Sequence, residues 1–330
     1  MKVLGYTHAH SLDQFNLQPM ELPDPTPSGR DLLVEVKAVG LNPIDYKVRT
    51  RRSGSAGQPV ILGWDAAGIV RAHGTDATRF KVGDEVFYSG DLKRAGSYAT
   101  RQLVDERLVA LKPNTLSFTE AAALPLTSLT AYEMLFEKMG LTGSDRRTIL
   151  IIGGAGGVGS QAIQLLKLKT PMTVIATASR PESQQWVKSL GADHVVSHQT
   201  FVADIRALGM KFVNFIFSTT HSGEHWSKMA DIIAPFGEVG IIDDGDGLDL
   251  SVFKSKSVSL HWELMFTKSS FDYRAASQGE ILEKVKSLIE SGKMRTTANR
   301  VLTGLTVENI RAGHTMLEQH TNVGKVVVQL

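Results

Sequence analysis

Residues 149–160, "ILIIGGAGGVGS", decide the fold of the second half of the chain. A short apolar run leads directly into the spacing Gly154-x-Gly156-x-x-Gly159, and the residues that follow have helical periodicity. Glycines let the backbone turn tightly between a strand and a helix, and they let the helix pack closely on the sheet. The stretch therefore predicts a buried parallel strand, a glycine turn and a helix, in that order.

The same turn predicts a dinucleotide site. Because no side chain stands in the way, the amides of Gly157 and Val158 at the start of the helix can approach a pyrophosphate and stabilise its charge. The alternative is a glycine-rich turn that serves only the packing of helix on sheet. The position of the turn, directly between a predicted strand and a predicted helix, favours a bound dinucleotide.

The residues after the next strand favour NADPH over NADH. An acidic residue is expected at this place when the ribose hydroxyls of NAD are bound. The chain has Ser179 and Arg180 there, and the first carboxylate is that of Glu182. A hydroxyl and a guanidinium suit the 2′-phosphate of NADPH, which a carboxylate would repel. The alternative for Arg180 is a solvated loop residue.

The pattern of the chain changes near its middle. From residue 148 on, apolar runs alternate with helical stretches, which is typical of an α/β fold with a doubly wound parallel sheet. Roughly the first 120 residues instead hold short alternating runs broken by Pro and Gly turns, as in a largely antiparallel β domain. Ser117 and Glu120 predict a capping box at the start of a helical connection over 117–140. The strand at 324–330 is expected to return to the first domain.

Composition limits the functions that the chain can have. A length of 330 residues suits about two domains. Lys and Arg number 36 against 34 Asp and Glu. The net charge of +2 is too small to indicate nucleic acid or a membrane surface as a partner. The absence of cysteine excludes disulfides, a thiol nucleophile and thiolate zinc sites. No signal-peptide or membrane-spanning run is visible, and we expect a cytoplasmic protein that acts on a small molecule.

The chain resembles the medium-chain dehydrogenase/reductase superfamily, and within it the zinc-independent quinone oxidoreductases. The resemblance rests on seven ordered motifs: "GLNPIDYK" (40–47), "GWDAAGIV" (63–70), "VGDEV" (82–86), "GSYA" (96–99), "AAALPLTSLTAYE" (121–133), "GGAGGVGS" (153–160) and "GKVVV" (324–328). It implies a GroES-like, mainly β substrate domain over 1–123 and 269–330 and a Rossmann NADP-binding domain over 124–268. It also implies a homodimer that pairs through the edge strand at 257–266.

The resemblance implies further cofactor contacts, although each of these residues could equally be a capping or loop residue. They are Asn42 and Thr127 or Thr130 near the nicotinamide, Ser218 and the backbone around Ile241 to Asp243 along the cofactor, His198 at the adenine ribose phosphate, and Asn322 and Lys325 at the C-terminal side of the cleft.

Residues 63–68, "GWDAAG", lack the ligands of a zinc site. Where the resemblance to the zinc-dependent branch calls for His and Glu, the chain has Trp64 and Asp65, and Asn42 stands at the place of a ligand Cys. Zinc needs about four N, O or S ligands, and an indole cannot serve as one. We therefore predict no metal, and we interpret Asp65 as a hydrogen-bonding residue that braces its loop. The zinc-type name borne by some relatives is not expected to describe this chain.

Histidines offer a second place to look for a metal. His221 and His225 have the i, i+4 spacing that places two imidazoles on one helical face, but Gly223 and a turn favour surface or capping roles. The "HAH" at 8–10 is expected to be an exposed turn.

A metal-free hydride transfer favours enones and quinones as substrates. A simple carbonyl needs a Lewis acid or proton relay to stabilise the alkoxide. Hydride addition to the β-carbon of an enone, or to a quinone, spreads the charge, so that neutral donors suffice. We predict Asn42 and Tyr46 as these donors, with Tyr46 or water as the proton source. Trp64 is predicted as an apolar wall that stacks on the substrate. The alternatives are core packing for Trp64 and a domain anchor for Tyr46.

Two other functions stay open. A zinc-type alcohol dehydrogenase would contain stoichiometric zinc. A non-catalytic NADPH-binding protein would bind the cofactor but reduce neither quinones nor enones.

Overall fold

The computed structural model describes residues 1–245 and 247–330, which form two compact units. The β unit comprises Met1–Leu129 and Met265–Leu330, and the α/β unit comprises Thr130–Leu264. The boundaries expected from the sequence, after residues 123 and 268, lie a few residues from these. Among the helices described, none is both long and apolar enough to cross a membrane.

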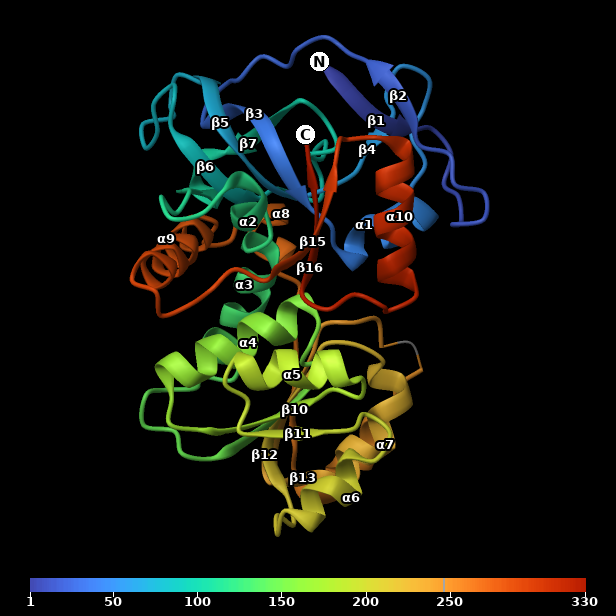
Figure 1. Cartoon of the computed structure of the whole chain (residues 1–330), viewed down its shortest axis with the longest axis vertical. Coiled ribbons are helices and arrows are strands. Elements are labelled where there is room, and N and C mark those ends of the chain that lie inside the picture. The colour runs from blue at the N-terminus through green and yellow to red at the C-terminus, as the bar shows by residue number, and fades with distance from the viewer. Residues whose placement is uncertain (246) are drawn as a thin grey trace. The chain divides into compact units, whose positions relative to one another are not determined.

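A six-stranded sheet forms the centre of the α/β unit (Figure 1). Its strands are β9 (Thr148–Ile152), β10 (Thr173–Thr177), β11 (His194–Val196), β12 (Val213–Ser218), β13 (Ile233–Ile241) and β14 (Ser259–Trp262). They lie in the order β11-β10-β9-β12-β13-β14, and every neighbouring pair is parallel. Because the order runs outward in both directions from β9, the sheet is doubly wound, and the predicted Rossmann fold is confirmed.

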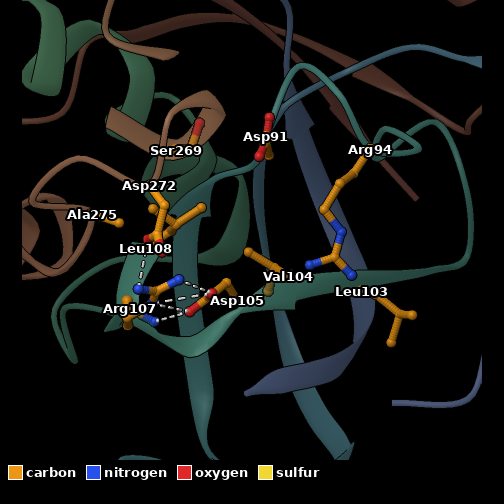
Figure 2. Close-up of a pocket in the computed structure, with 10 residues that line it drawn as sticks. All are labelled: Asp91, Arg94, Leu103, Val104, Asp105, Arg107, Leu108, Ser269, Asp272 and Ala275. Carbon is orange, nitrogen blue, oxygen red and sulfur yellow. Dashed lines mark hydrogen bonds and ion pairs between the residues drawn. The ribbon is translucent and has the colours of Figure 1, made fainter. Parts of the chain in front are cut away.

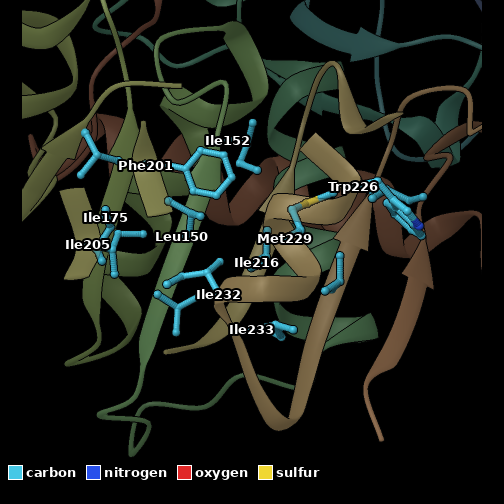
Figure 3. Packing of buried hydrophobic residues seen from close by; sticks show 14 of the residues in the cluster. Leu150, Ile152, Ile175, Phe201, Ile205, Ile216, Trp226, Met229, Ile232 and Ile233 are labelled. Atoms are coloured by element: carbon cyan, nitrogen blue, oxygen red, sulfur yellow. The ribbon is translucent and has the colours of Figure 1, made fainter. Parts of the chain in front are cut away.

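Helices connect these strands and cover the sheet. They are α4 (Gly157–Lys169), α5 (Pro181–Ser189), α6 (Phe201–Ala207) and α7 (Ser222–Ile232), with a 3-10 helix at Leu250–Lys256 before β14. Apolar side chains of α6 and α7, among them Phe201, Trp226 and Met229, pack with strand residues such as Leu150 and Ile216 (Figure 3). This core explains why the strand sequences are almost continuously apolar: both faces of a parallel sheet are buried.

The β unit holds two sheets built mainly from antiparallel strands. Its strands are β1 (Lys2–Tyr6), β2 (Gln18–Glu21), β3 (Asp31–Gly40), β4 (Val60–Ile61), β5 (Asp65–His73), β6 (Glu85–Ser89), β7 (Arg101–Asp105), β8 (Val109–Leu111), β15 (Ala298–Thr303) and β16 (Lys325–Gln329). One sheet has the order β2-β1-β4, and the other has the order β15-β16-β3-β5-β6-β8, with β7 paired to β3. Since β16 pairs with β3, the expected return of the C-terminal strand to the first domain is confirmed.

The helices of the β unit carry most of the differences from the sequence prediction. They are α1 (Pro43–Arg51), α2 (Phe118–Ala122), α8 (Phe266–Ser270), α9 (Ala276–Glu290) and α10 (Val307–Glu318), with a 3-10 turn at Glu106–Leu108. The capping box is confirmed, since Ser117 N donates to Glu120 Oε2 at 2.9 Å and Glu120 N to Ser117 Oγ at 3.3 Å. The helical connection expected over 117–140 is confirmed, although it is interrupted.

Three helical segments form this connection: α2, α3 (Pro125–Tyr132) and a π-helical segment at Glu133–Lys138. The first break falls immediately before Pro125, because proline lacks the N–H that would continue the helix and disfavours a helical conformation in the residue before it.

Candidate active site

The glycines of the turn between β9 and α4 differ in how closely the surrounding chain packs against them. A Cβ on Gly159 would lie 2.4 Å from the carbonyl oxygen of Gly153, and a Cβ on Gly154 would lie 2.8 Å from Ala176 Cβ. These two glycines are therefore required by the fold itself. A Cβ on Gly156 would meet only Gly153 O, at 3.4 Å, which is an ordinary contact. Packing therefore does not explain the glycine at position 156.

The first turn of α4 is built to receive an anion. Gly156 is its N-cap and offers no side chain to the helix amides. Gly157 and Val158 follow, and both are half-buried, so their positions are not sealed by the surrounding chain. Because the N-terminus of a 13-residue helix carries a partial positive charge and unpaired N–H groups, this turn fits a phosphate.

Residues predicted for the adenosine phosphate come together at the ends of β10 and β11. Ser179 Oγ lies 2.5 Å from Nδ1 of His198, and the His198 amide donates to the same oxygen at 3.3 Å. Arg180 is exposed and forms the N-cap of α5. The structure thus brings the Ser179 hydroxyl and the His198 imidazole together at the carboxyl edge of the sheet, with the exposed Arg180 next to Ser179 in the chain.

Ser218 and Ile241 end β12 and β13 at the same edge of the sheet, where they are paired in register. The side chain of Ser218 is completely buried, and its hydroxyl donates to Thr220 O at 3.4 Å and accepts from Ser222 Oγ at 2.8 Å. Ile241 is buried as well. Their side chains therefore serve the protein interior, and only their backbone groups remain as candidates for a cofactor contact.

A buried polar cluster lies in the β unit where β3 leads into α1. Lys325 Nζ donates to Leu41 O at 2.8 Å, to Asn42 Oδ1 at 2.6 Å and to Asp65 Oδ2 at 3.0 Å. Asp65 Oδ2 also accepts from Asn42 Nδ2 at 2.8 Å, and Asp65 Oδ1 accepts from the Leu126 amide at 2.6 Å. Asp65 therefore joins β5 to α3 and β16, and the predicted bracing role of its carboxylate is confirmed.

This cluster corrects two predicted roles. Asn42 was expected to donate to the substrate, but its amide nitrogen donates to Asp65 and to Gly40 O, which uses both amide hydrogens inside the protein. Lys325 was expected to contact the cofactor at the cleft, but its side chain is 3% exposed and its three N–H groups all have protein acceptors. Both residues hold the structure together instead of facing a ligand.

The other predicted residues of the β unit differ in exposure. Tyr46, on α1, is half-buried. Trp64 is completely buried, packs edge-on against Phe266 with ring centroids 6.1 Å apart, and has an indole N–H without an acceptor among the described residues. Its burial favours core packing over a wall that stacks on substrate. Thr127 is buried, and its hydroxyl donates to Leu124 O at 3.2 Å.

Two predicted cofactor contacts remain to be placed. Thr130, the first residue of the α/β unit, is buried. Asn322 lies half-buried in the loop before β16, and its amide donates to Gly324 O at 3.1 Å. Asn322 therefore shapes its own loop.

A hydrogen-bonded series of buried side chains extends from α1 to α10. None of its contacts was predicted from the sequence. Tyr98 Oη lies 3.1 Å from both Asp45 Oδ2 and His314 Nε2. Arg49 donates to His314 Nδ1 at 2.8 Å and to Glu318 Oε1 at 2.7 Å. Because arginine only donates, His314 carries its proton on Nε2 and donates it to Tyr98, whose hydroxyl in turn donates to Asp45. The amphipathic spacing of Ile310, His314 and Leu317 could have indicated α10.

Burial shifts the pKa values in this chain strongly. Burial raises the pKa of Asp45 to about 7, against the lowering effect of the Asn42 amide and the Lys325 ammonium. Burial also lowers the pKa of His314 to about 3, and the neighbouring Arg49 adds to this effect. His314 is therefore neutral at neutral pH, while Asp45 exchanges its proton there.

The histidines that do not belong to this hydrogen-bonded series form no metal site among the described residues. His221 is the N-cap residue of α7 with a left-handed backbone, as expected, although its side chain makes no capping hydrogen bond. The surface or capping role expected for His225 is wrong, because this residue is buried within the helix. The turn at 8–10 was expected to be exposed, but His10 is buried with its Nδ1 2.8 Å from His8 O. Among the described residues, no group of three or more His, Asp or Glu side chains is placed to hold a metal.

A cavity of about 150 Å³ in the β unit contains none of the predicted site residues (Figure 2). Its charged side chains are paired with each other or with neighbours. Arg107 bonds Asp105 and Asp272, each at 2.7 Å, and Arg94 bonds Asp31 at 2.8 Å. The paired charges stabilise the loops that surround the cavity.

A GroES-like β domain together with a Rossmann domain defines the class of two-domain dehydrogenases and reductases. The family model of the alcohol dehydrogenase GroES-like domain matches residues 28–114, and that of the zinc-binding dehydrogenases matches residues 157–276. The chain belongs to the medium-chain dehydrogenase/reductase superfamily, in its quinone oxidoreductase-like branch.

Relatives whose names indicate different activities are similar to this chain over most or all of its length. A zinc-type alcohol dehydrogenase-like protein of Staphylococcus aureus is 38% identical over the full length of both chains. A 2-methylene-furan-3-one reductase of Solanum lycopersicum is 34% identical over 89% of this chain and 70% of its own. An NADPH-dependent alkenal/one oxidoreductase of Arabidopsis thaliana is 30% identical over 90% of this chain and 71% of its own.

Two solved structures have the same fold. A protein of Rhizobium etli assigned to the zinc-dependent alcohol dehydrogenases is 47% identical with a TM-score of 0.95, covering 100% of this chain and 98% of its own. A quinone oxidoreductase of Pseudomonas syringae is 25% identical with a TM-score of 0.86, covering 100% and 99%. The chain is thus similar to proteins named for zinc and to proteins named for quinone or alkenal reduction.

The donor set at the place of a zinc site does not fit zinc. Trp64 offers no lone pair for coordination, and Asn42 Oδ1 already binds the Lys325 ammonium. Both oxygens of Asp65 are engaged as well, by Lys325 and by the Leu126 amide. A divalent cation at these oxygens would lie beside a buried ammonium, and the repulsion between them would be severe.

Proposed function

We propose that the chain is an NADPH-dependent reductase that transfers hydride to quinones or α,β-unsaturated carbonyl compounds without a metal. The observation that carries this proposal is the Lys325 ammonium between Asn42 and Asp65, because the oxygens that stand at the ligand positions bind an ammonium group. Relatives named as reductases of a methylene-furanone and of alkenals and alkenones support the substrate class.

NADPH is the proposed cofactor, and the residues of the α/β unit fit it. The uncapped first turn of α4 would hold the pyrophosphate, with Gly156 leaving room for it. Ser179, Arg180 and His198 would bind the 2′-phosphate through donors that a ribose hydroxyl does not require. Bound NADPH supplies a hydride ion.

Tyr46 is the proposed proton donor on the substrate side. When hydride bonds to the β-carbon, the electron pair of the double bond moves toward the carbonyl and leaves negative charge on its oxygen. A hydrogen bond from the Tyr46 hydroxyl stabilises this oxygen, and a proton from Tyr46 or water completes the saturated ketone at the α-carbon or the hydroquinone at oxygen. Asn42 acts differently from the sequence prediction: it is the N-cap residue of α1, its backbone amide donates to Asp45 Oδ2 at 2.8 Å, and its side chain binds Asp65 and Lys325, so that it positions the helix that carries Tyr46.

NADPH oxidation with a panel of quinones and short enones tests the proposal. We expect turnover with members of the panel and a fall in kcat of roughly 10²-fold in Tyr46→Phe. Tyr273→Phe is the matched control, because Tyr273 is an exposed tyrosine of the same unit. An unchanged kcat in Tyr46→Phe would remove Tyr46 from the mechanism. Tight NADPH binding without any turnover would show a binding protein instead.

A further inference from the structure

The ammonium group of Lys325 is enclosed by three oxygen atoms of the β unit. They are Leu41 O, Asn42 Oδ1 and Asp65 Oδ2, at 2.8, 2.6 and 3.0 Å from Nζ. We name these three oxygens the ammonium cage. The lysine enters the cage from the first residue of β16 and leaves only 3% of its surface exposed. Each N–H of the ammonium therefore has one acceptor, and the cage is filled completely.

The cage has the chemistry of a cation site. A carboxylate, an amide oxygen and a peptide carbonyl are the oxygen ligands that hard metal ions prefer. Asp65 supplies one negative charge, which the ammonium neutralises. A buried carboxylate without a cationic partner is costly, so the cage requires a cation for stability.

We propose that Lys325 is the resident cation of this site, occupying with its ammonium the place that the family name assigns to a metal. The proposal deepens the metal-free reaction proposed above by naming the group that replaces the metal. Lys325 is a positioning residue: it holds Asn42, the N-cap of α1, and through it the helix that carries Tyr46. If the Lys325 side chain is truncated in Lys325→Ala, the empty anionic oxygen cage has the size and charge for n-propylammonium.

Thermal unfolding of the full-length protein tests this consequence. Lys325→Ala should lower Tm by roughly 10 °C, because it leaves a buried carboxylate unpaired. Addition of n-propylammonium chloride should restore several degrees in this variant and none in the wild type. Tetramethylammonium chloride at the same ionic strength and n-propanol at the same concentration are the controls, and neither should restore Tm. Equal responses to all three additives would overturn the proposal.

Lys325→Met separates charge from volume. Methionine fills the space of the lysine stem without a cation, so this variant should be destabilised and should not respond to n-propylammonium. The double variant Asp65→Asn with Lys325→Met removes both charges and should regain part of the lost Tm. A Lys325→Met variant as stable as the wild type would contradict a need for a cation in the cage.

Zinc content supplies a measurement that needs no variant. The wild-type protein, incubated with zinc chloride and desalted, should retain less than roughly one tenth of an equivalent per chain, since catalytic sites bind zinc through about three protein ligands and the ammonium already occupies all three oxygens of the cage. Stoichiometric zinc would overturn the proposal. Neither readout uses turnover, so a lack of reductase activity would leave the cage standing, and a failed cage would leave the reductase activity to be judged separately.

Discussion

Asp45 is completely buried next to Tyr46, and its two carboxyl oxygens have different surroundings. Oδ2 accepts hydrogen bonds from the Asn42 amide and the Tyr98 hydroxyl, whereas Oδ1 has no partner among the described residues. Burial raises the pKa of Asp45 from 3.8 to about 7. A carboxyl group in this position retains its proton far more readily in the folded protein than in the unfolded chain.

This shift predicts how stability depends on pH. Between pH 4 and pH 7 the folded state holds the Asp45 proton and the unfolded state does not, so the contribution of Asp45 to stability is lost as pH rises through about 7. In Asp45→Asn this loss is absent. The free energy of unfolding of the variant, relative to wild type, should therefore rise across this window, by at most about 1.4 kcal/mol per pH unit.

The comparison must be made as a difference, because His314 acts in the opposite direction. Its pKa is lowered from 6.5 to about 3, so its contribution is present at neutral pH and is lost as pH falls. His314 is present in both proteins and cancels in the difference. Urea unfolding at a series of pH values measures the two curves, and parallel curves would show that Asp45 does not titrate in this range.

Ser179 offers a direct test of cofactor choice. Ser179→Asp places a carboxylate where we propose the 2′-phosphate of NADPH to lie, and it should repel that phosphate while suiting a ribose hydroxyl. The ratio of kcat/KM for NADPH to that for NADH should fall more than roughly tenfold, which corresponds to about 1.4 kcal/mol. Ser189→Asp, on the exposed end of α5, is the control. An unchanged ratio would contradict a role of Ser179 in cofactor choice.

At the scale of elements, the turn between β9 and α4 separates folding from binding. Gly156→Ala adds a methyl group that the fold accommodates at 3.4 Å, whereas the methyl group in Gly159→Ala would lie 2.4 Å from a backbone oxygen. We expect Gly156→Ala to unfold like the wild type without cofactor but to lose the stabilisation by NADPH. That stabilisation amounts to about 2.7 kcal/mol when NADPH exceeds its Kd a hundredfold.

Gly159→Ala should instead be destabilised by roughly 1–3 kcal/mol even without cofactor. Gly143→Ala, whose added Cβ would come no closer than 3.5 Å to other atoms, serves as the control. Calorimetry with and without NADPH measures both effects. Full stabilisation of Gly156→Ala by NADPH would show that the turn has a packing role only.

The elements differ in how well local sequence predicted them. Strands β9, β10 and β12 follow from short apolar runs, because almost every residue in them is buried, and α5 to α7 follow from apolar periodicity, because each buries one face. Helix α1 has few apolar residues, strand β11 has only three residues, and α10 was overlooked despite its amphipathic spacing. The ammonium cage could not be predicted from local sequence patterns, because Lys325 and Asp65 are 260 positions apart in the sequence.

At the scale of the whole molecule, we propose a homodimer formed through β14. This strand is the last of its sheet, so its outer backbone groups lack a strand partner within the described chain. Trp262, on β14, is 54% exposed, which is unusual for a large apolar side chain. Sedimentation velocity should show a dimer for the wild type and a monomer for Trp262→Arg. A monomeric wild type would contradict this assembly.

We propose that this chain reduces a carbon–carbon double bond by hydride transfer from NADPH, with an ammonium group at the place of the zinc for which some relatives are named. The position of a transferred deuterium distinguishes this reaction from a zinc-dependent carbonyl reduction. The purified protein, with its zinc content measured, is incubated with NADPH deuterated at the nicotinamide C4 and a short enone, and the product is analysed by NMR. We expect a saturated ketone with deuterium on the β-carbon, formed by zinc-free protein. Deuterium on the carbonyl carbon of an allylic alcohol, formed only by zinc-loaded protein, would contradict it.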